Sequence, residues 1–265
     1  MKNGRKTVGI LGGMGPLASA HFLSLVVSHT LAERDSDHID TVMTSRASTP
    51  DRTAHLLGKS PKNPLDTMKI DVDTLIFGGA DMIAVPCNTA MAYYEELSLY
   101  SAAPILNIVS LTVGAARAAG IKKLSLLATE GTVTSKIYQK ECERSGILCA
   151  VPDEPTQSVI NDIIYQKIKA GAYKVNEIYP IIDGFLLDSD AVVFGCTELS
   201  LIDLSGFDKK DYIIDSSRVL AMNAIKECGG TPVGFSEVIW QNSPKFRACS
   251  AQILTKNSAI AKSTL

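Results

Sequence analysis

The sequence predicts an α/β protein built from two pseudo-symmetric, three-layer domains, each with a parallel sheet, and a functional site in the cleft between them. Short β-rich runs alternate with helical patterns along the chain, which is typical of parallel strands joined by helical crossovers. The chain also repeats itself, because TVGILGGMGP is matched by KLSLLATEGT and IAVPCNTA is matched by AVVFGCTE. Each half thus has a strand before a small-residue loop, and a later strand before a cysteine.

The first half, residues 1–115, predicts strands that alternate with helices. Its first strand runs into the segment GGMGP, and the glycines and proline there indicate a loop before the next helix. The segment SRASTPDRTAHLLG, which follows the second strand, is expected to be a loop because of its Ser, Pro and Asp content. The expected strands cover 7–11, 39–44, 82–85 and 105–108, and the expected helices cover 17–33, 64–79, 89–100 and 110–119.

The second half, residues 116–216, restarts the same pattern at Lys123. We expect a helix over Ser217–Glu227 to return to the first half, so that residues 217–265 complete the first domain. The sequence beyond Gly229 has weak periodicity and reads as an appendage, with about ten disordered residues at its end. The expected strands cover 123–129, 147–151, 191–195 and 212–215, and the expected helices cover 133–145, 157–170 and 174–187.

The composition describes a globular chain with a small-molecule ligand. It has 265 residues, 46% hydrophobic, and a net charge of −2 from 26 basic and 28 acidic residues. Because these charges are interspersed, neither a nucleic-acid surface nor a membrane surface is indicated. No apolar stretch approaches the ~18–20 residues of a membrane span, and glycines interrupt the apolar N-terminal segment, which argues against a secretory signal.

Cysteine usage favours the cytoplasm and singles out two thiols. The six cysteines contain no CxxC pair, which favours reduced thiols. We expect Cys142, Cys149, Cys228 and Cys249 to be inert packing residues. Cys87 and Cys196 differ, because each directly follows a strand, and the carboxyl ends of parallel strands form the ligand-binding edge of such sheets.

Two thiols that face each other across a cleft suit proton transfer at a carbon centre. One thiolate removes a proton from one face of the carbon, and the opposite thiol returns a proton to the other face. A helix N-terminus or a cationic neighbour can lower a thiol pKa from about 8.5 to ~3.5–7.5. Cys87 and Cys196 therefore predict racemase or isomerase chemistry with a base that needs no metal.

Polar groups at the same junctions suit a carboxylate ligand. Asn88, Thr89 and Thr197 follow the two cysteines and offer amide and hydroxyl groups beside the free backbone N–H groups of helix starts. Capping of the helices is an alternative role for the three side chains, and the two roles are compatible.

Two arginines of the expected loop are candidate carboxylate ligands. The guanidinium groups of Arg46 and Arg52 offer a planar fork that matches a carboxylate. Pairing of Arg52 with its neighbour Asp51 is the alternative.

Other ligand motifs are incomplete. Gly13, Gly15 and Ala18 have the spacing of a dinucleotide loop, but the next strand does not end in an acidic residue for a ribose. The segment GKS at 58–60 lacks the earlier glycine of a phosphate loop. The four histidines have no paired metal-ligand spacing: His21, His29, His38 and His55.

The ordered motifs GILGGMGP, PDRT, PCNTA, LLATEGT, IKAG and GCTEL resemble those of the aspartate/glutamate racemase family, over about residues 7–225. The resemblance implies a cofactor-independent racemase with one acid/base cysteine from each domain, Cys87 and Cys196. It further implies that Arg52 and Lys169 bind the distal carboxylate of the substrate. The other substrate-binding residues that it implies are Met14, Asn88, Thr89, Thr129, Thr132, Thr197 and Glu198.

The chain departs from the family at one position, since family members commonly continue PCNTA with histidine and this chain has Met91. A histidine there would tune the neighbouring thiol or bind substrate. We expect a cytoplasmic, homodimeric racemase that acts on aspartate or glutamate. A maleate isomerase, a hydantoin racemase and a non-catalytic amino-acid sensor remain the alternatives.

Overall fold

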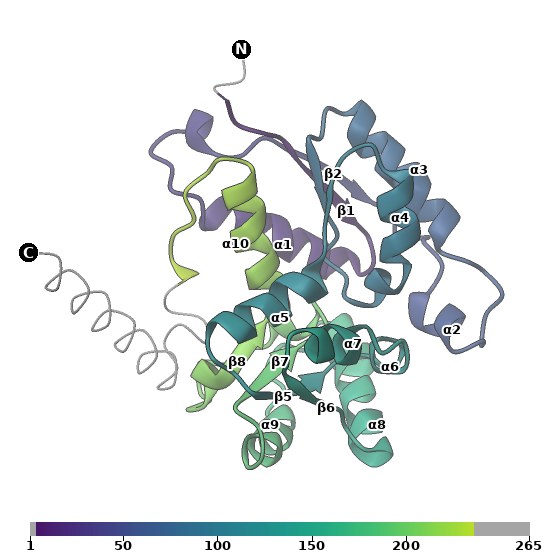
Figure 1. Ribbon diagram of the computed structural model, residues 1–265, viewed down its shortest axis with the longest axis vertical. Helices are drawn as coiled ribbons and strands as arrows, with labels where there is room; N and C mark the ends of the chain where they lie inside the picture. The colour runs from purple at the N-terminus through teal and green to yellow at the C-terminus, as the bar shows by residue number, and fades with distance from the viewer. Residues whose placement is uncertain (1–3, 236–265) are drawn as a thin grey trace, which may run out of the picture.

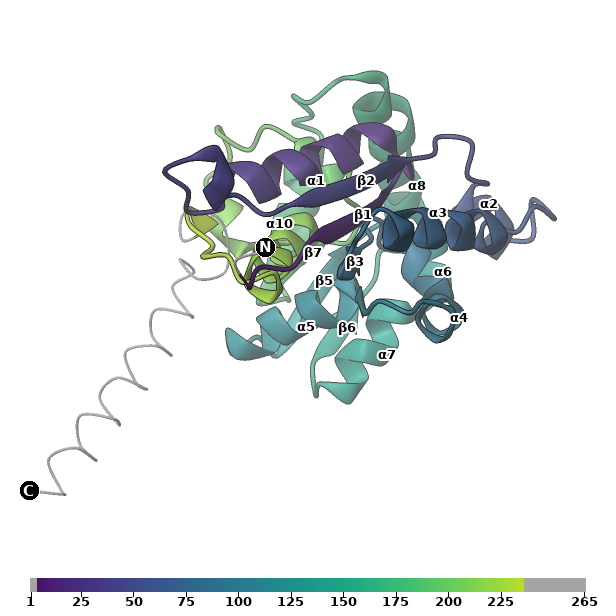
Figure 2. The same ribbon diagram turned by 90° about the horizontal axis from the view of Figure 1, so that it is seen from above.

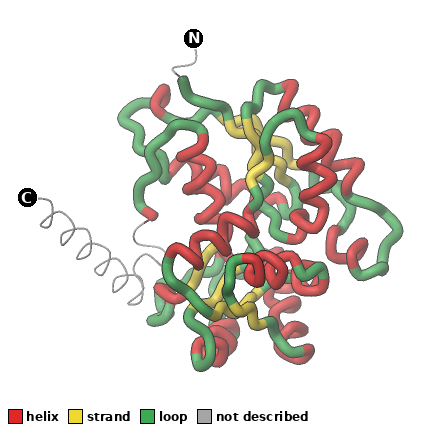
Figure 3. Tube along the Cα trace, viewed as in Figure 1, coloured by secondary structure: helices red, strands yellow, loops and turns green. Residues whose placement is uncertain are grey.

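The computed structural model describes residues 4–235 and contains two four-stranded parallel sheets, which confirms the predicted fold class (Figure 1). The strand orders are β2-β1-β3-β4 and β6-β5-β7-β8, so both sheets have the same topology. Figure 3 shows the strands as two separate groups surrounded by helices. The strands are β1 (Val8–Gly12), β2 (Thr41–Ser45), β3 (Met82–Ala84), β4 (Ile105–Leu106), β5 (Lys123–Leu127), β6 (Leu148–Ala150), β7 (Ala191–Phe194) and β8 (Ile213–Asp215).

Helices connect the strands in both halves, as parallel pairing requires. Those of the first half are α1 (Pro16–Ser28), the 3₁₀ helix η1 (Asp35–Asp37), α2 (Arg52–Leu56), α3 (Leu65–Phe77), the 3₁₀ helix η2 (Thr89–Tyr93), α4 (Tyr94–Tyr100) and α5 (Ile108–Ala118). Those after β5 are α6 (Glu130–Thr134), α7 (Ile137–Arg144), α8 (Glu154–Asp162), the π-helical η3 (Ile163–Lys167), the 3₁₀ helix η4 (Ile168–Ala170), α9 (Ile178–Leu186), the 3₁₀ helices η5 (Leu199–Leu201) and η6 (Lys210–Tyr212), and α10 (Ser216–Glu227).

Helix α10 returns from β8 to the first half and packs against α1 and α5 (Figures 1 and 2). One apolar core therefore runs from the first sheet through α5 and α10 to one face of the second sheet, where Leu124 and Leu126 are fully buried. The other face of the second sheet, with Leu127 and Phe194, packs on a separate core with α8 and α9. The two halves share one apolar core, and this packing holds them in position relative to each other.

Several elements differ from the sequence prediction. The segment expected to be a loop contains α2, whose first turn is capped by Asp51 Oδ1, which accepts a 2.8 Å bond from the amide of Ala54. The helix expected over 133–145 is broken at Lys136, whose φ of 58° is left-handed. A periodic apolar pattern does not reveal a single residue that reverses the backbone.

Two helices near the predicted site residues are irregular: the one that follows Cys87 and the one whose last turn contains Lys169. The helix expected over 89–100 begins as the five-residue η2 before α4. The helix expected over 157–170 begins earlier, at Glu154, and ends as a π turn and a 3₁₀ turn. Such turns are often found at functional sites.

Candidate active site

Both predicted cysteines line one cavity between the halves. Cys87 lies just beyond β3 and Cys196 just beyond β7, and each is 6% exposed. The other lining residues come from segments that follow β1, β2, β3, β5 and β7 and from the turns η3 and η4, so the carboxyl ends of both sheets contribute to the cavity. The cavity is lined by Met14, Asp51, Arg52, Thr53, Cys87, Asn88, Thr89, Thr129, Tyr165, Lys169, Cys196, Thr197 and Glu198.

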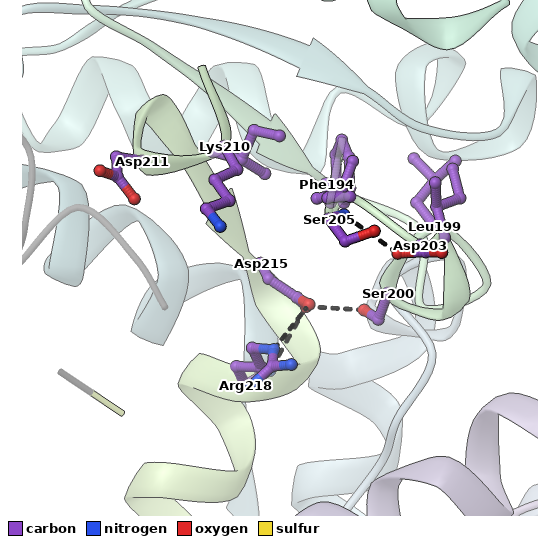
Figure 4. Close-up of a pocket in the computed structure, with 12 residues that line it drawn as sticks. Phe194, Leu199, Ser200, Asp203, Ser205, Lys210, Asp211, Asp215 and Arg218 are labelled. Carbon is purple, nitrogen blue, oxygen red and sulfur yellow. Dashed lines mark hydrogen bonds and ion pairs between the residues drawn. The ribbon is translucent and has the colours of Figure 1, made fainter. Parts of the chain in front are cut away.

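This cavity is small, with a free volume of about 20 Å³, which is space for roughly one water molecule. A larger cavity, of about 340 Å³, lies beside α10, where Asp215 accepts a 2.6 Å hydrogen bond from Ser200 and lies 3.6 Å from Arg218 (Figure 4). We assign the site to the smaller cavity because nucleophilic, cationic and hydroxyl groups converge there, which volume alone does not indicate.

Cys196 is held as a neutral thiol. Its Sγ donates a hydrogen bond to Glu198 Oε2 at 3.0 Å, and Glu198 is itself only 5% exposed. Burial raises the pKa of Cys196 well above its usual range, and the adjacent Glu198 carboxylate raises it further. A thiol that stays protonated at neutral pH is available to act as an acid.

Cys87 has more support for its thiolate form. Burial raises the pKa of Cys87, but the positive charges of Arg52 and Lys169 and a hydrogen bond from the amide of Ala90 oppose this rise. The expected lowering contributions from a helix start and from cations are present, but the net pKa of Cys87 is raised. Burial dominates, and the short η2 offers less of the aligned dipole that a longer α-helix provides.

The two predicted cations lie beside the cysteines. Arg52 donates from Nη1 to the carbonyl oxygens of Thr49, at 3.3 Å, and Pro50, at 2.9 Å. Within residues 4–235 its buried Nε has no hydrogen-bond partner. Lys169 Nζ lies 3.6 Å from Glu198 Oε1 and 4.6 Å from the centre of the Tyr165 ring. Both side chains are thus placed to meet an anion in the cavity.

Arg46 does not line the cavity, so its predicted role as a carboxylate ligand is wrong. Its Nε and Nη2 each lie 2.9 Å from Oδ1 of Asp71, whose side chain is 1% exposed. The alternative in which Asp51 pairs with Arg52 also fails, because Asp51 caps α2. The buried carboxylate of Asp71 needs a charged partner, and Arg46 is that partner.

Three threonine hydroxyls form a closed triangle that joins the halves. Thr89 Oγ1 lies 3.0 Å from Thr129 Oγ1 and 2.9 Å from Thr132 Oγ1, and the latter two are 3.1 Å apart. Thr132 lies behind the cavity rather than in its lining. The Thr197 hydroxyl donates to the Pro86 carbonyl at 3.1 Å, which is a second contact between halves.

Asn88 does not cap a helix, contrary to the alternative role. Its Nδ2 donates to Ser216 Oγ at 2.9 Å, and its Oδ1 accepts a 2.7 Å hydrogen bond from Tyr138. Asn88 therefore links the Cys87 segment to α7 and α10.

Sequence reasoning missed Asp51, Thr53 and Tyr165 as lining residues. Tyr165 donates to Thr53 Oγ1 at 3.2 Å across the two halves. Thr53 belongs to the motif PDRT, which was a usable signal. No sequence signal marks Tyr165, because the π turn that contains it cannot be recognised from the sequence.

Met91 and His55 lie outside the cysteine cavity. Met91 is 4% exposed and lines a separate cavity of about 550 Å³ beside α5 and α7. His55 Nδ1 lies 2.7 Å from the Tyr93 hydroxyl. The structure thus gives Met91 no direct contact with the cavity that holds Cys87, in contrast to the role expected for a histidine there.

Among residues 4–235, no group of three or more His, Cys, Asp and Glu side chains is arranged to hold a metal ion. In the same range, no helix has the length and apolar character needed to cross a membrane.

Comparison with known proteins gives the family. The sequence model of the Asp/Glu/hydantoin racemases matches residues 11–224. The chain is 29% identical over 226 residues to the broad specificity amino-acid racemase RacX of Bacillus subtilis, and this match covers 82% of this chain and 96% of that one. It is 31% identical to the Picrophilus torridus aspartate racemase, with a TM-score of 0.77 over 86% of this chain and 96% of that one.

A more distant structure shares the fold. The glutamate racemase of Thermus thermophilus, in complex with β-chloro-D-alanine, is 19% identical, with a TM-score of 0.59 over 84% of this chain and 80% of that one. The family match spans both cysteines and both sheets. The chain belongs to the Asp/Glu/hydantoin racemase family of amino-acid racemases and related enzymes.

Proposed function

We propose that this chain is a cofactor-independent racemase that interconverts L- and D-aspartate or L- and D-glutamate by a two-base mechanism. The observation that carries the proposal is that Cys87 and Cys196, one from each half, line the same cavity as Arg52 and Lys169. Two thiols that line one cavity suit transfer of the α-proton from one face of the substrate to the other.

The surroundings of the thiols suggest their resting roles. Cys87, with Arg52, Lys169 and the Ala90 amide nearby, becomes the thiolate that removes the α-proton. Cys196, which donates to Glu198, is the thiol that returns a proton. After one turnover Cys87 holds the proton taken from Cα and Cys196 is the thiolate, so the roles are exchanged for the reverse direction.

A dicarboxylic substrate fits the charges of the cavity. The unpartnered Nε of Arg52 and the ammonium of Lys169 would meet the distal carboxylate, since a buried anion needs a paired charge. Asn88, Thr89, Thr129 and Thr197 would surround the α-carboxylate, and Met14 would pack on the carbon chain. Aspartate is suggested by the Picrophilus torridus relative, and a wider range by RacX.

The decisive experiment is exchange of the α-proton in heavy water. We expect aspartate or glutamate to gain deuterium at Cα while its optical rotation decays, and Cys87→Ser and Cys196→Ser each to abolish racemisation with an unchanged circular dichroism spectrum. Cys228→Ser is the control, because Cys228 does not line the cavity. Full activity in either single catalytic variant would rule out the two-base mechanism.

The same experiment separates the alternatives. A non-catalytic amino-acid sensor would bind aspartate or glutamate without any label at Cα. A hydantoin racemase would label only the cyclic substrate, and a maleate isomerase would convert maleate to fumarate. We favour amino acids because the relatives with printed activities racemise them.

We also propose a cytoplasmic homodimer in which residues 4–115 and 217–235 form one domain and residues 116–216 the other; the remainder of the predicted first domain, residues 1–3 and 236–265, lies outside the described residues. The neighbouring helices α3 and α4 expose Ile70, Phe77 and Leu99, at 55%, 95% and 89%. An apolar surface of this kind marks a protein contact. Light scattering that gives the mass of a single chain would contradict the dimer.

A further inference from the structure

A buried relay of three hydrogen bonds crosses between the two halves of the molecule. The Tyr138 hydroxyl, from α7, donates to Asn88 Oδ1 at 2.7 Å. Asn88 Nδ2 donates to Ser216 Oγ, on α10, at 2.9 Å, and Ser216 Oγ donates to the carbonyl oxygen of Phe194 at 2.7 Å. Helices α7 and α10 both pack against α5 (Figure 1). The four residues are at most 2% exposed, so solvent hardly competes for these bonds.

The last acceptor fixes the direction of this relay. A backbone carbonyl only accepts hydrogen bonds, so the single hydroxyl proton of Ser216 is committed to Phe194. Ser216 Oγ must then accept from the amide nitrogen of Asn88, which leaves the amide oxygen to accept from Tyr138. Burial raises the pKa of Tyr138, so its hydroxyl keeps the proton that it donates. Because a reversed amide would leave buried polar atoms unpaired, the relay holds the Asn88 side chain in one orientation.

Two members of the relay lie beside the candidate catalytic thiols. Asn88 directly follows Cys87, and Phe194 lies two residues before Cys196. The two hydrogen bonds of the Ser216 hydroxyl, one accepted and one donated, therefore connect the chain segment of one thiol to the chain segment of the other.

A second hydrogen bond connects the same two segments on the other side of the thiols. Thr197 follows Cys196, and its hydroxyl donates at 3.1 Å to the carbonyl oxygen of Pro86, which precedes Cys87. Each thiol thus has a connected residue before it and another after it. We call the relay and the bond from Thr197 to Pro86 together the thiol clamp.

We propose that Ser216 and Tyr138 are positioning residues that keep Cys87 and Cys196 at a fixed separation through the thiol clamp. Neither Ser216 nor Tyr138 lines the cavity, so both act through Asn88. Two-base proton transfer needs both sulfur atoms within reach of one carbon, and a displacement of ~1 Å caused far from the chemistry can cost ~10²-fold in rate. The effect on turnover rests on the proposed racemase function, whereas the connection between the two segments does not.

The next residue of α10 offers a matched control. Ser217 is 1% exposed, and within residues 4–235 its Oγ has no hydrogen-bond partner. Ser216→Ala and Ser217→Ala therefore remove the same buried group from the same helix, and only the first breaks the thiol clamp. We expect Ser216→Ala to lower kcat for aspartate or glutamate about tenfold. Its KM should change little, because Arg52 and Lys169 are untouched, and Ser217→Ala should retain the kcat and KM of the natural chain.

A second variant tests whether the relay acts as one unit. Tyr138→Phe keeps the buried ring and removes only the hydroxyl that orients Asn88, so we expect a several-fold lower kcat. In the double variant with Ser216→Ala, the loss should be smaller than the product of the two single losses, because residues of one hydrogen-bond network are not additive. A loss equal to that product would show that Tyr138 and Ser216 act independently, contrary to the relay.

Hydrogen exchange of backbone amides tests the thiol clamp without any racemisation. The amides of Met91 and Leu199 donate to carbonyl oxygens of the two connected segments, at 2.9 and 3.0 Å, so their exchange reports local opening there. The measurement is mass spectrometry of peptides from the full chain after exchange in heavy water. We expect the peptides that contain these amides to exchange several-fold faster in Ser216→Ala than in Ser217→Ala.

Two further results would overturn the proposal. One is equal amide exchange in Ser216→Ala and Ser217→Ala, and the other is a Ser216→Ala variant that racemises with the kcat of the natural chain. Absence of deuterium at Cα with the natural chain would instead contradict the proposed racemase function. In that case the exchange comparison alone decides whether Ser216 connects the two segments.

Discussion

At the residue scale, the two candidate catalytic thiols show how burial and charge compete. Burial is the largest influence on both, and it raises both pKa values. Lys169 and Glu198 influence the pKa of both thiols, but the positive charge of Arg52 lowers that of Cys87, and Glu198 contacts Cys196 directly. An acid and a base of the same chemical type can thus be distinguished by their surroundings.

This arrangement predicts opposite shifts of the pH profile in two variants. Because the base must be a thiolate, kcat/KM should rise with pH, and a raised pKa places that rise on the alkaline side. Arg52→Gln removes a positive charge that lowers the pKa of Cys87, so the rise should move to higher pH. Glu198→Gln removes a negative charge that raises both thiol pKa values, so the rise in kcat/KM should move to lower pH.

The measurement is kcat/KM over pH ~6–10, read as the position of the rising limb and not as the maximal rate. Because the two thiols titrate as a coupled pair, the apparent pKa of the rising limb cannot be assigned to one of them. The comparison therefore uses the shift of this apparent pKa between variants and not its absolute value. Lys59→Gln is the control, since Lys59 is exposed and pairs with Glu130 at 3.7 Å. Shifts of the same sign in both variants would contradict the assignment of charges.

At the element scale, the short helix α2 carries the candidate substrate-binding Arg52 at its first position. Its N-terminus is held by Asp51, which accepts a 2.8 Å hydrogen bond from the amide of Ala54. A five-residue helix has little stability of its own, so its cap has a large share in fixing it. The position of Arg52 therefore depends on one side chain that precedes it.

Asp51→Ala should raise KM for the dicarboxylic substrate several-fold and lower the free energy of unfolding by about 1 kcal/mol. Asp153→Ala is the matched control, because Asp153 caps α8 in the same way, through the amide of Thr156 at 3.0 Å, and does not line the cavity. It should cost similar stability and leave KM unchanged. Asp51→Ser, which retains a cap, should restore most of the affinity, and failure to do so would assign Asp51 a direct contact with substrate.

The elements also show what the sequence could predict and what it could not. Periodicity and the internal repeat predicted both sheets, because strands buried on both faces give strong local signals. The same signals placed Cys87, Cys196, Thr89 and Thr197 just beyond strands. They could not show that Arg52 lines the cavity and Arg46 does not. Arg46 instead pairs with the buried carboxylate of Asp71, which is distant from it in sequence. Contacts of this kind exist only in the folded chain.

At the scale of the whole molecule, each half contributes a loop that fits closely against the other. A Cβ added at Gly15 would lie 2.7 Å from Glu198 Oε1, and one added at Gly131 would lie 2.6 Å from Thr53 Oγ1. The two glycines follow β1 and β5, which are equivalent strands of the repeat. Small residues in these loops let the halves close around the thiols.

The small volume of the cavity has a consequence for binding. About 20 Å³ is too little for an amino acid with two carboxylates. Binding of the proposed dicarboxylic substrate would therefore need the halves to separate or the Lys169–Glu198 pair to open, and Thr53 contacts Tyr165 and Gly131 between the halves. Closure around bound substrate would then exclude water from the thiols.

Gly131→Ala tests whether this close fit between the halves matters. The added methyl group would also meet the Thr53 Cα, at 2.8 Å, which a side-chain rotation does not relieve. We expect a loss of about 1–3 kcal/mol of stability from overpacking and a several-fold rise in KM, because Thr53 adjoins Arg52. Gly114→Ala is the matched control, since Gly114 is exposed within α5 and its Cβ would meet nothing within 4 Å. Alanine there should stabilise the helix by up to about 1 kcal/mol with KM unchanged. Calorimetry and steady-state kinetics on both variants provide the comparison, and equal KM values in the two would mean that substrate binds without the close fit of Gly131 on Thr53.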